Sequence, residues 1–108
     1  MNGTTENRQI QIAVVMRSVR SAIGYNQIQF AEFIGSSKPT IARIETLELP
    51  MNESLYVQMI ERLKEIGVTV SALSNEGVSV AFDENALKLL QARLQDESLR
   101  RSDRKTKN

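Results

Sequence analysis

The chain has no cysteine, no histidine and no tryptophan among its 108 residues. Without cysteine and histidine there can be no disulfide, no thiolate or imidazole metal site, and neither the usual general base nor the cysteine nucleophile of enzymes. No apolar run approaches the roughly 20 residues that a membrane-spanning helix needs, and no acidic loop has the pattern of a calcium site. The sequence therefore predicts a cytoplasmic protein with no metal, no cofactor, no membrane partner and no enzymatic activity.

Apolar and charged residues are present in ordinary proportions, 41% and 25%, which is enough apolar material for one core. The formal net charge of +1 hides a segregation of sign along the chain. Residues 1–46 and 100–108 are net positive, whereas residues 47–99 are net negative. The net charge therefore says little about partners, but the segregation suggests that different parts of the chain have different roles.

Apolar side chains spaced by three and four residues predict four helices in the first two thirds of the chain. The first two span residues 7–23 and 27–34, the third begins at residue 38 in a segment that Pro50 closes, and the fourth runs from 52 or 54 to about 66. Asn26 and Ser37 can cap the second and third helices. Residues 1–6 are expected to form a polar leader. Gly35 ends the second helix, and Pro39 lies in the first turn of the third, where its missing N–H costs nothing.

After Gly67 the helical pattern gives way to a period-two alternation, which predicts a β-hairpin whose apolar face covers other parts of the protein. The residues of that face are Val68, Val70, Ala72, Val78, Val80 and Phe82. The turn ends in Gly77, as a type I turn with a bulge requires, and Asp83 can cap a last helix. The two strands are expected at residues 68–72 and 78–82, joined by a turn at 74–77. The last helix is expected at residues 84–100, and the charged tail at residues 101–108 is expected to be disordered.

Two short helices joined by a glycine-containing turn, within residues 27–45, define a helix-turn-helix. In such a unit the first helix braces the second, whose N-terminal half enters the major groove of DNA. Ile41 and Ile44 would anchor the second helix in the core. The opposite face would then carry the side chains expected to contact DNA bases, which are Lys38, Pro39, Thr40 and Arg43.

This region resembles the phage repressor/Cro-type (XRE) helix-turn-helix family over about residues 8–66. The residues that carry the resemblance are Arg20, Gln27, Ala31, Gly35, Ile41, Ile44 and Glu45. The family places an arginine before the glutamine that starts the second helix, then an alanine, a glycine and an Ile-x-x-Ile/Trp-Glu ending. The resemblance implies a mainly α fold, with a four-helix Cro/CI-type DNA-binding core at residues 7–66 followed by a hairpin and a C-terminal helix. It also implies a bacterial or phage origin.

The resemblance further implies roles for individual side chains. Arg20 and Glu45 match a partly buried ion pair between the first helix and the end of the third. The residues expected to contact DNA phosphates are Arg17, Asn26, Gln27 and Ser37. The family commonly has a glycine soon after the final glutamate. Residues 46–50 contain none, so the loop after the third helix is expected to differ.

A single recognition helix contacts too few base pairs to select one site in a genome, so a homodimer on a palindromic operator is expected. Residues 67–100 are the expected dimerisation element, through Val78, Val80, Phe82, Leu87, Leu90 and Leu94. The sequence thus predicts a sequence-specific regulator of transcription, most simply a repressor, that binds double-stranded DNA. The alternative is an antitoxin or anti-repressor that retains the helix-turn-helix fold and binds another protein through residues 67–100.

Overall fold

The structure, a computed structural model, describes residues 2–96, which form five helices and one antiparallel hairpin. In chain order the elements are α1 (Asn2–Ile23), α2 (Gln27–Ile34), α3 (Lys38–Glu45), α4 (Glu53–Glu65), β1 (Val68–Val70), β2 (Val80–Phe82) and α5 (Glu84–Leu94). The mainly helical fold with a small hairpin agrees with the prediction. Over these residues, none of the helices combines the length and the apolar character needed to cross a membrane.

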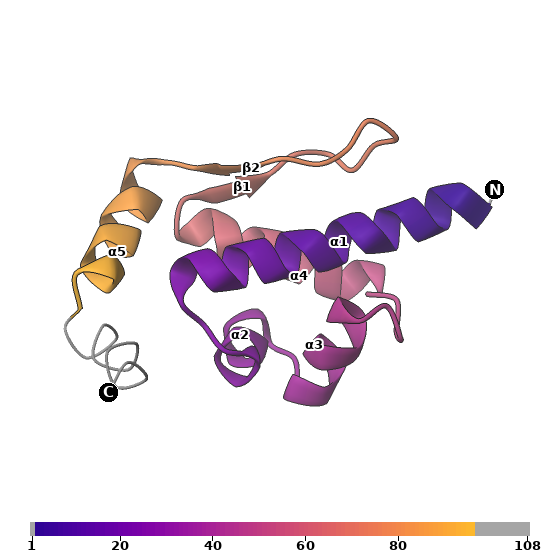
Figure 1. The fold of residues 1–108 in the computed structure, drawn as a ribbon, viewed down its shortest axis with the longest axis horizontal. Coiled ribbons are helices and arrows are strands. Elements are labelled where there is room, and N and C mark those ends of the chain that lie inside the picture. Colours follow the sequence, from indigo (N-terminus) through magenta and orange to yellow (C-terminus); the bar gives the residue numbers. More distant parts are fainter. Residues whose placement is uncertain (1, 97–108) are drawn as a thin grey trace, which may run out of the picture.

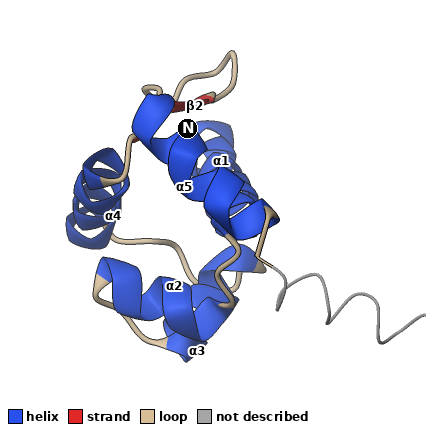
Figure 2. Ribbon diagram, turned by 90° about the vertical axis from the view of Figure 1, so that its left-hand side faces the viewer, coloured by secondary structure: helices blue, strands red, loops and turns tan. Residues whose placement is uncertain are grey.

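The helix α1 runs through the middle of the molecule and separates the hairpin from α2 and α3 (Figure 1). The side view in Figure 2 agrees, with β2 at the top and with α2 and α3 at the bottom. Helix α4 packs against α2 and β1, and α5 packs against α1 and β2. The hairpin therefore lies on the opposite side of the molecule from α3.

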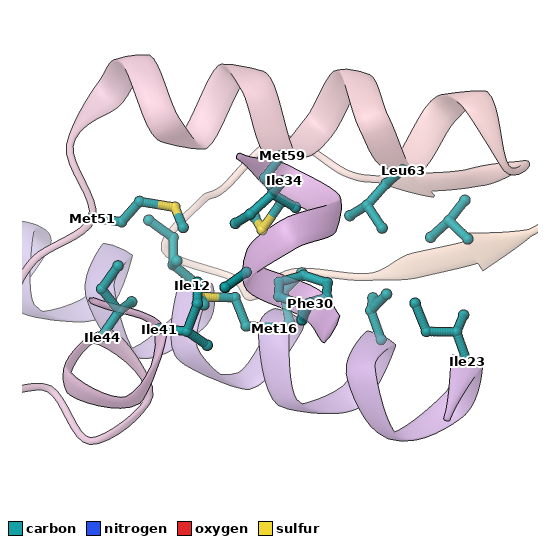
Figure 3. Close-up of a cluster of buried hydrophobic side chains, with 14 of the residues drawn as sticks. Ile12, Met16, Ile23, Phe30, Ile34, Ile41, Ile44, Met51, Met59 and Leu63 are labelled. Carbon is teal, nitrogen blue, oxygen red and sulfur yellow. The ribbon is translucent and has the colours of Figure 1, made fainter. Parts of the chain in front are cut away.

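One apolar core holds the helices together (Figure 3). The side chains of α1 that the helical period predicted to face inward are all buried, namely Ile12, Met16, Val19 and Ile23. Those that α2, α3 and α4 bury against them include Phe30, Ile34, Ile41, Ile44, Met59 and Leu63. Each such burial contributes about 1.5–3 kcal/mol. Helices of eight residues are too short to be stable alone, so this shared core is what maintains α2 and α3.

The four later helices each begin at a capping side chain that the sequence predicted. The caps of α2, α3, α4 and α5 are Asn26, Ser37, Asn52 and Asp83, and each accepts a hydrogen bond from a backbone N–H three residues later. Of the two alternatives for the start of α4, the structure therefore selects Asn52 over Ser54. Such caps typically stabilise a helix by about 1 kcal/mol, which explains why these starts could be located from local sequence.

Two predicted helix boundaries are wrong. Helix α1 begins at Asn2, so residues 2–6 are helical and do not form a polar leader. None of them is proline, and polar composition alone does not stop a helix. Helix α5 ends at Leu94, whose side chain is 73% exposed, so that no buried contact supports another turn. The predicted continuation at residues 97–100 and the tail at residues 101–108 lie outside the described residues.

The hairpin is confirmed, but its strands are shorter than predicted. The pairs are Val68 with Phe82, Thr69 with Ala81, and Val70 with Val80. Val68 is buried, while Val70, Val80 and Phe82 are half-buried against the core. The apolar face of these paired residues therefore covers the helices, as the alternation predicted.

The backbone pairing of β1 and β2 ends where the side chain of Ser71 replaces a backbone carbonyl as hydrogen-bond acceptor. The N–H of Ser79 donates to Oγ of Ser71 at 2.8 Å, while the N–H of Ser71 donates to the carbonyl oxygen of Ser79 at 2.9 Å. Serine side chains compete with regular pairing in this way. Ala72, which was predicted to face the core, is consequently exposed.

The tip of the hairpin is fastened to α1. The predicted turn is present, with the N–H of Gly77 donating to the carbonyl oxygen of Ser74 at 3.2 Å and a φ of +125° at Gly77. The same oxygen of Ser74 accepts from Nε2 of Gln11 at 2.6 Å and from Nδ2 of Asn7 at 3.3 Å. These bonds hold the hairpin along α1 and away from α2 and α3.

Arg8 joins the start of α1 to α4. Its guanidinium forms an ion pair with Glu53 and lies 5.1 Å from the ring centroid of Tyr56. Burial raises the pKa of the Tyr56 hydroxyl above 10.0, and the positive charge of Arg8 opposes this shift. Glu53 is largely exposed, so the ion pair contributes less than about 1 kcal/mol.

Leu47 occupies a backbone conformation that normally belongs to glycine. It has a φ of +66° and is the one non-glycine residue with positive φ within residues 2–96. Helix α3 ends there with the N–H of Leu47 bonded to the oxygen of Ile44 and the N–H of Glu48 bonded to the oxygen of Arg43, at 3.1 and 2.8 Å. Glycine is usual at this point because a Cβ costs about 1–2 kcal/mol in the left-handed region. The loop thus makes the turn that glycine favours, with leucine in its place.

Replacing this leucine with glycine should stabilise the protein. The side chain of Leu47 is 54% exposed, so Leu47→Gly loses little burial, removes the strain and raises the free energy of unfolding by about 0.5–1 kcal/mol. Urea denaturation measures the change. Leu47→Ala is the matched control, because it removes the same side chain but keeps the strained Cβ. An alanine variant as stable as the glycine variant would contradict the explanation.

Candidate nucleic-acid interface

The turn between α2 and α3 is fixed from both sides. Gly35 ends α2 with a φ of +79°, and the N–H of Ser36 donates to the oxygen of Ala31 at 2.7 Å. From α4, Nε2 of Gln58 donates to the oxygen of Ile34 at 2.7 Å. A Cβ on Gly35 would collide with this amide. The turn therefore depends both on a local glycine and on a distant side chain that no local sequence pattern indicates.

Helix α3 divides into a buried face and an exposed face. Ile41 and Ile44 are buried, and the helix packs against α1 and α2. The side chains predicted to contact bases fall on the other side, where Lys38, Pro39 and Arg43 are exposed and Thr40 is half-buried. Helix α3 itself lies away from the hairpin, at the bottom of Figures 1 and 2. The structure thus brings the four residues together on one accessible helix face.

The first turn of α3 is organised by Ser37, which was predicted to contact a phosphate. Its Oγ accepts from the N–H of Thr40 at 3.4 Å and donates to Oγ1 of Thr40 at 3.0 Å. Pro39 has no N–H to satisfy, so the capping bond leaves the N–H of Lys38 as an open donor at this helix start. Ser37 and Thr40 are therefore hydrogen-bonded to each other, whereas Lys38 is exposed.

The start of α2 is organised by a capping box. Oδ1 of Asn26 accepts from the N–H of Gln29 at 2.8 Å, and Oε1 of Gln29 accepts from the N–H of Asn26 at 2.9 Å. This arrangement leaves the N–H groups of Gln27 and Ile28 without an intrahelical acceptor. Gln29 was not among the predicted site residues, although Asn followed three residues later by Gln is the pattern that identifies such a box.

A buried carboxylate joins α1, α2 and α3. Both oxygens of Glu45, whose side chain is 4% exposed, accept from Arg20, with Nε to Oε2 and Nη2 to Oε1 each at 2.9 Å. Oε1 also accepts from Nε2 of Gln27 at 3.0 Å. The structure therefore contains the Arg20–Glu45 ion pair that the resemblance implied. The side-chain amide of Gln27, which was predicted to contact a phosphate, donates to Glu45 instead. Only the backbone N–H of Gln27 therefore remains open at the start of α2.

Arg17 lies one turn before Arg20 on α1 and is exposed. It forms no ion pair with any carboxylate of residues 7–96, the part of the chain whose side chains are described. The same holds within that range for Lys38 and Arg43. By contrast, Arg62 and Lys88 pair with carboxylates on their own helices. The cations predicted to contact DNA thus have no ion-pair partner among the side chains that the structure describes.

The predicted dimerisation residues fall into two groups. Val78, Val80, Phe82 and Leu90 are half-buried and pack against the core of their own chain. Leu87 and Leu94 are 56% and 73% exposed and lie two turns apart on the outer face of α5. Within one chain, only the second group leaves large side chains largely uncovered.

Comparison with known proteins found no matching family model, curated protein or solved structure. The functional interpretation therefore depends on the exposed cations of α3, the open N–H groups of α2 and the buried pair that fixes both helices.

Removing the buried carboxylate should destabilise the whole arrangement. Glu45→Ala leaves the guanidinium of Arg20 and the amide of Gln27 without their acceptor, so the free energy of unfolding should fall by about 2–3 kcal/mol. Glu65→Ala, which breaks the exposed pair with Arg62, should change it by less than about 1 kcal/mol. Chemical denaturation of both variants measures the difference, and equal losses would contradict the structural role of Glu45.

Proposed function

We propose that this protein is a sequence-specific DNA-binding regulator of transcription, most simply a repressor, with a Cro/CI-type helix-turn-helix that acts as a homodimer. The observation that carries the proposal is the exposed face of α3, where Lys38 and Arg43 lack ion pairs within residues 7–96. That face belongs to a short helix held by α1 and α2.

The chemistry of this face fits the major groove of DNA. An arginine can donate two hydrogen bonds to O6 and N7 of guanine, and a lysine can donate to the same atoms. The face carries Lys38 near the start of α3 and Arg43 in its last turn. Pro39 between them presents apolar surface and no donor. Base recognition is therefore assigned mainly to Lys38 and Arg43.

The start of α2 fits a backbone phosphate. Its open N–H groups at Gln27 and Ile28 and the positive end of the helix dipole both favour an anion. Contacts of this kind carry no sequence information, but they fix how the recognition helix sits in the groove. Because Glu45 ties α2 to α3 through Gln27, a phosphate bound at α2 would orient α3.

The outer face of α5 fits a second copy of the chain. Leu87 and Leu94 expose large apolar side chains to water, and an isologous contact would bury the same pair on each subunit. Two recognition helices related by a two-fold axis require a palindromic site, which supplies the specificity that one helix lacks.

The same leucines favour the alternative function. An adaptor of the antitoxin or anti-repressor kind would use the exposed face of α5 to bind a different protein. Such an adaptor has no need of unpaired cations on α3. DNA binding therefore decides between the two functions.

The first test is selection of a binding site from a randomised duplex pool. The wild-type protein should enrich a palindrome, and Arg43→Ala should weaken binding to it by about 1–3 kcal/mol, or roughly 10- to 100-fold, with relaxed preference at one position in each half-site. Fluorescence anisotropy measures the affinities. Arg62→Ala, on α4, removes the same charge and should leave affinity and preference nearly unchanged. Equal behaviour of the two variants, or no enrichment by the wild type, would reject the proposal.

The second test concerns the assembly. Placing a carboxylate on the outer face of α5, as Leu94→Asp, should convert a dimer to a monomer, because a charge cannot be buried there without a partner. Analytical ultracentrifugation gives the mass. Val57→Asp alters another exposed apolar residue, on α4, and should leave the dimer intact. A wild-type protein that is monomeric at all concentrations would contradict the dimer.

A further inference from the structure

Arg93 connects α5 to the junction between α1 and α2. Its guanidinium carbon lies 4.9 Å from the ring centroid of Tyr25. The side chain also lies beside Gly24, since a Cβ built there would lie 3.6 Å from Nη1 of Arg93. The cation is therefore placed over the short segment that leads from α1 into α2, although it comes from a helix far along the chain. In Figure 1, α5 lies beside this end of α1.

This guanidinium has no counter-charge inside the described part of the chain. No carboxylate there forms an ion pair with Arg93. Its Nε is buried without a hydrogen-bond partner, although the side chain as a whole is only half-buried. A half-buried charge that is not neutralised is costly, so an external anion that reached the terminal nitrogens would remove an existing penalty.

The segment that Arg93 contacts leads directly into the start of α2, which is the candidate phosphate-binding position. Tyr25, under the guanidinium, directly precedes Asn26, the cap of α2. The open N–H groups of α2 follow at the next two residues. The stack on Tyr25 limits the motion of Arg93 and keeps its charge near this helix start. Arg93 thus lies against the two residues that precede the cap, Gly24 and Tyr25, and the two amide donors belong to the two residues that follow it.

From this arrangement we infer that Arg93 binds the DNA phosphate that the N-terminus of α2 holds. The inference rests on the proposed function and deepens it, because it adds a phosphate contact from the C-terminal helix to a surface otherwise formed by α1, α2 and α3. The bond is a charge-assisted one between a guanidinium and a phosphate oxygen. It carries no sequence preference, so its effect is the same on specific and non-specific DNA.

A purely structural role for Arg93 makes a different prediction. The stack on Tyr25 could serve only to hold α5 against α1. Loss of the arginine would then lower stability and could weaken DNA binding indirectly, but it would not change how many counterions DNA releases on binding. The salt dependence of binding therefore separates the two roles.

The experiment uses the full-length protein and a fluorescein-labelled duplex of scrambled sequence. Each lost phosphate contact should reduce the slope of log affinity against log salt by about 0.9. Arg93→Gln should show this reduction and, at about 0.1 M salt, a roughly fivefold to tenfold weaker affinity. Arg93→Lys keeps the charge but loses the planar stack, so it should keep the wild-type slope.

Lys64→Gln is the matched control. Lys64 is exposed on α4 and, within residues 7–96, also lacks an ion pair, but it forms no contact with Tyr25 or Gly24 of the kind that Arg93 forms. Its loss should leave the slope unchanged. A wild-type slope in Arg93→Gln, or an equal reduction in Lys64→Gln, would overturn the inference. Melting curves confirm that each variant is folded at the assay temperature.

Failure of this inference and failure of the proposed function give different results. One outcome is that the wild type binds the scrambled duplex with a steep salt slope but selects no sequence. In that case the proposed regulatory function is wrong, and the salt slope of Arg93→Gln still decides whether Arg93 contacts a phosphate. If the wild type selects a palindrome and Arg93→Gln keeps the full slope, only the Arg93 contact is wrong. If the wild type binds no duplex, both are wrong.

Discussion

The buried carboxylate of Glu45 is the interaction on which the geometry of the candidate interface depends. It accepts from Arg20 on α1 and from Gln27 on α2, and it ends α3. Charges this deeply buried are tolerated only when their partners are in place, so the three helices can pack in few other ways. A recognition surface needs this property more than it needs stability, because base contacts tolerate little displacement of the helix.

The exposed face of α3 is the counterpart of this buried network. Ile41, Ile44 and Glu45 occupy the inner side of the helix, so the side chains that remain face water by geometric necessity. Geometry does not require Lys38 and Arg43 to lack ion pairs within residues 7–96. Neighbouring acidic residues could have neutralised these two side chains, as acidic residues neutralise a cation on α4 and another on α5. The contrast is what makes this face a candidate for an anionic ligand.

Most of the fold could be predicted from the sequence because its signals are local. The helical period located the buried side of α1, and the caps Asn26, Ser37 and Asp83 located later helix starts. Each signal is carried by residues within one or two turns of one another. The start of α1 lacked such a signal, and the polar residues before residue 7 were misjudged for that reason.

The features that were missed depend on residues distant in sequence or on strain. Gln58 holds the end of α2 from another helix, and nothing near Gln58 in the sequence indicates its acceptor. Leu47 adopts a positive-φ backbone conformation that leucine disfavours, and the hydrogen bonds at the end of α3 offset the cost of that conformation. Arg93 contacts Tyr25 because the hairpin places α5 beside α1. Local patterns cannot report any of these.

The helix α5 gives the two proposed activities a physical connection. Its inner face carries Ala86 and Leu90 against the core, with Arg93 over Tyr25, whereas Leu94 points outward. Successive residues on a helix diverge by about 100°, so Arg93 and Leu94 address different surfaces although they are adjacent in sequence. In the proposed dimer, an outward contact that shifts α5 also shifts Arg93 relative to the start of α2. Subunit pairing and phosphate binding would then be linked through one rigid element, and each would favour the other by the same free energy.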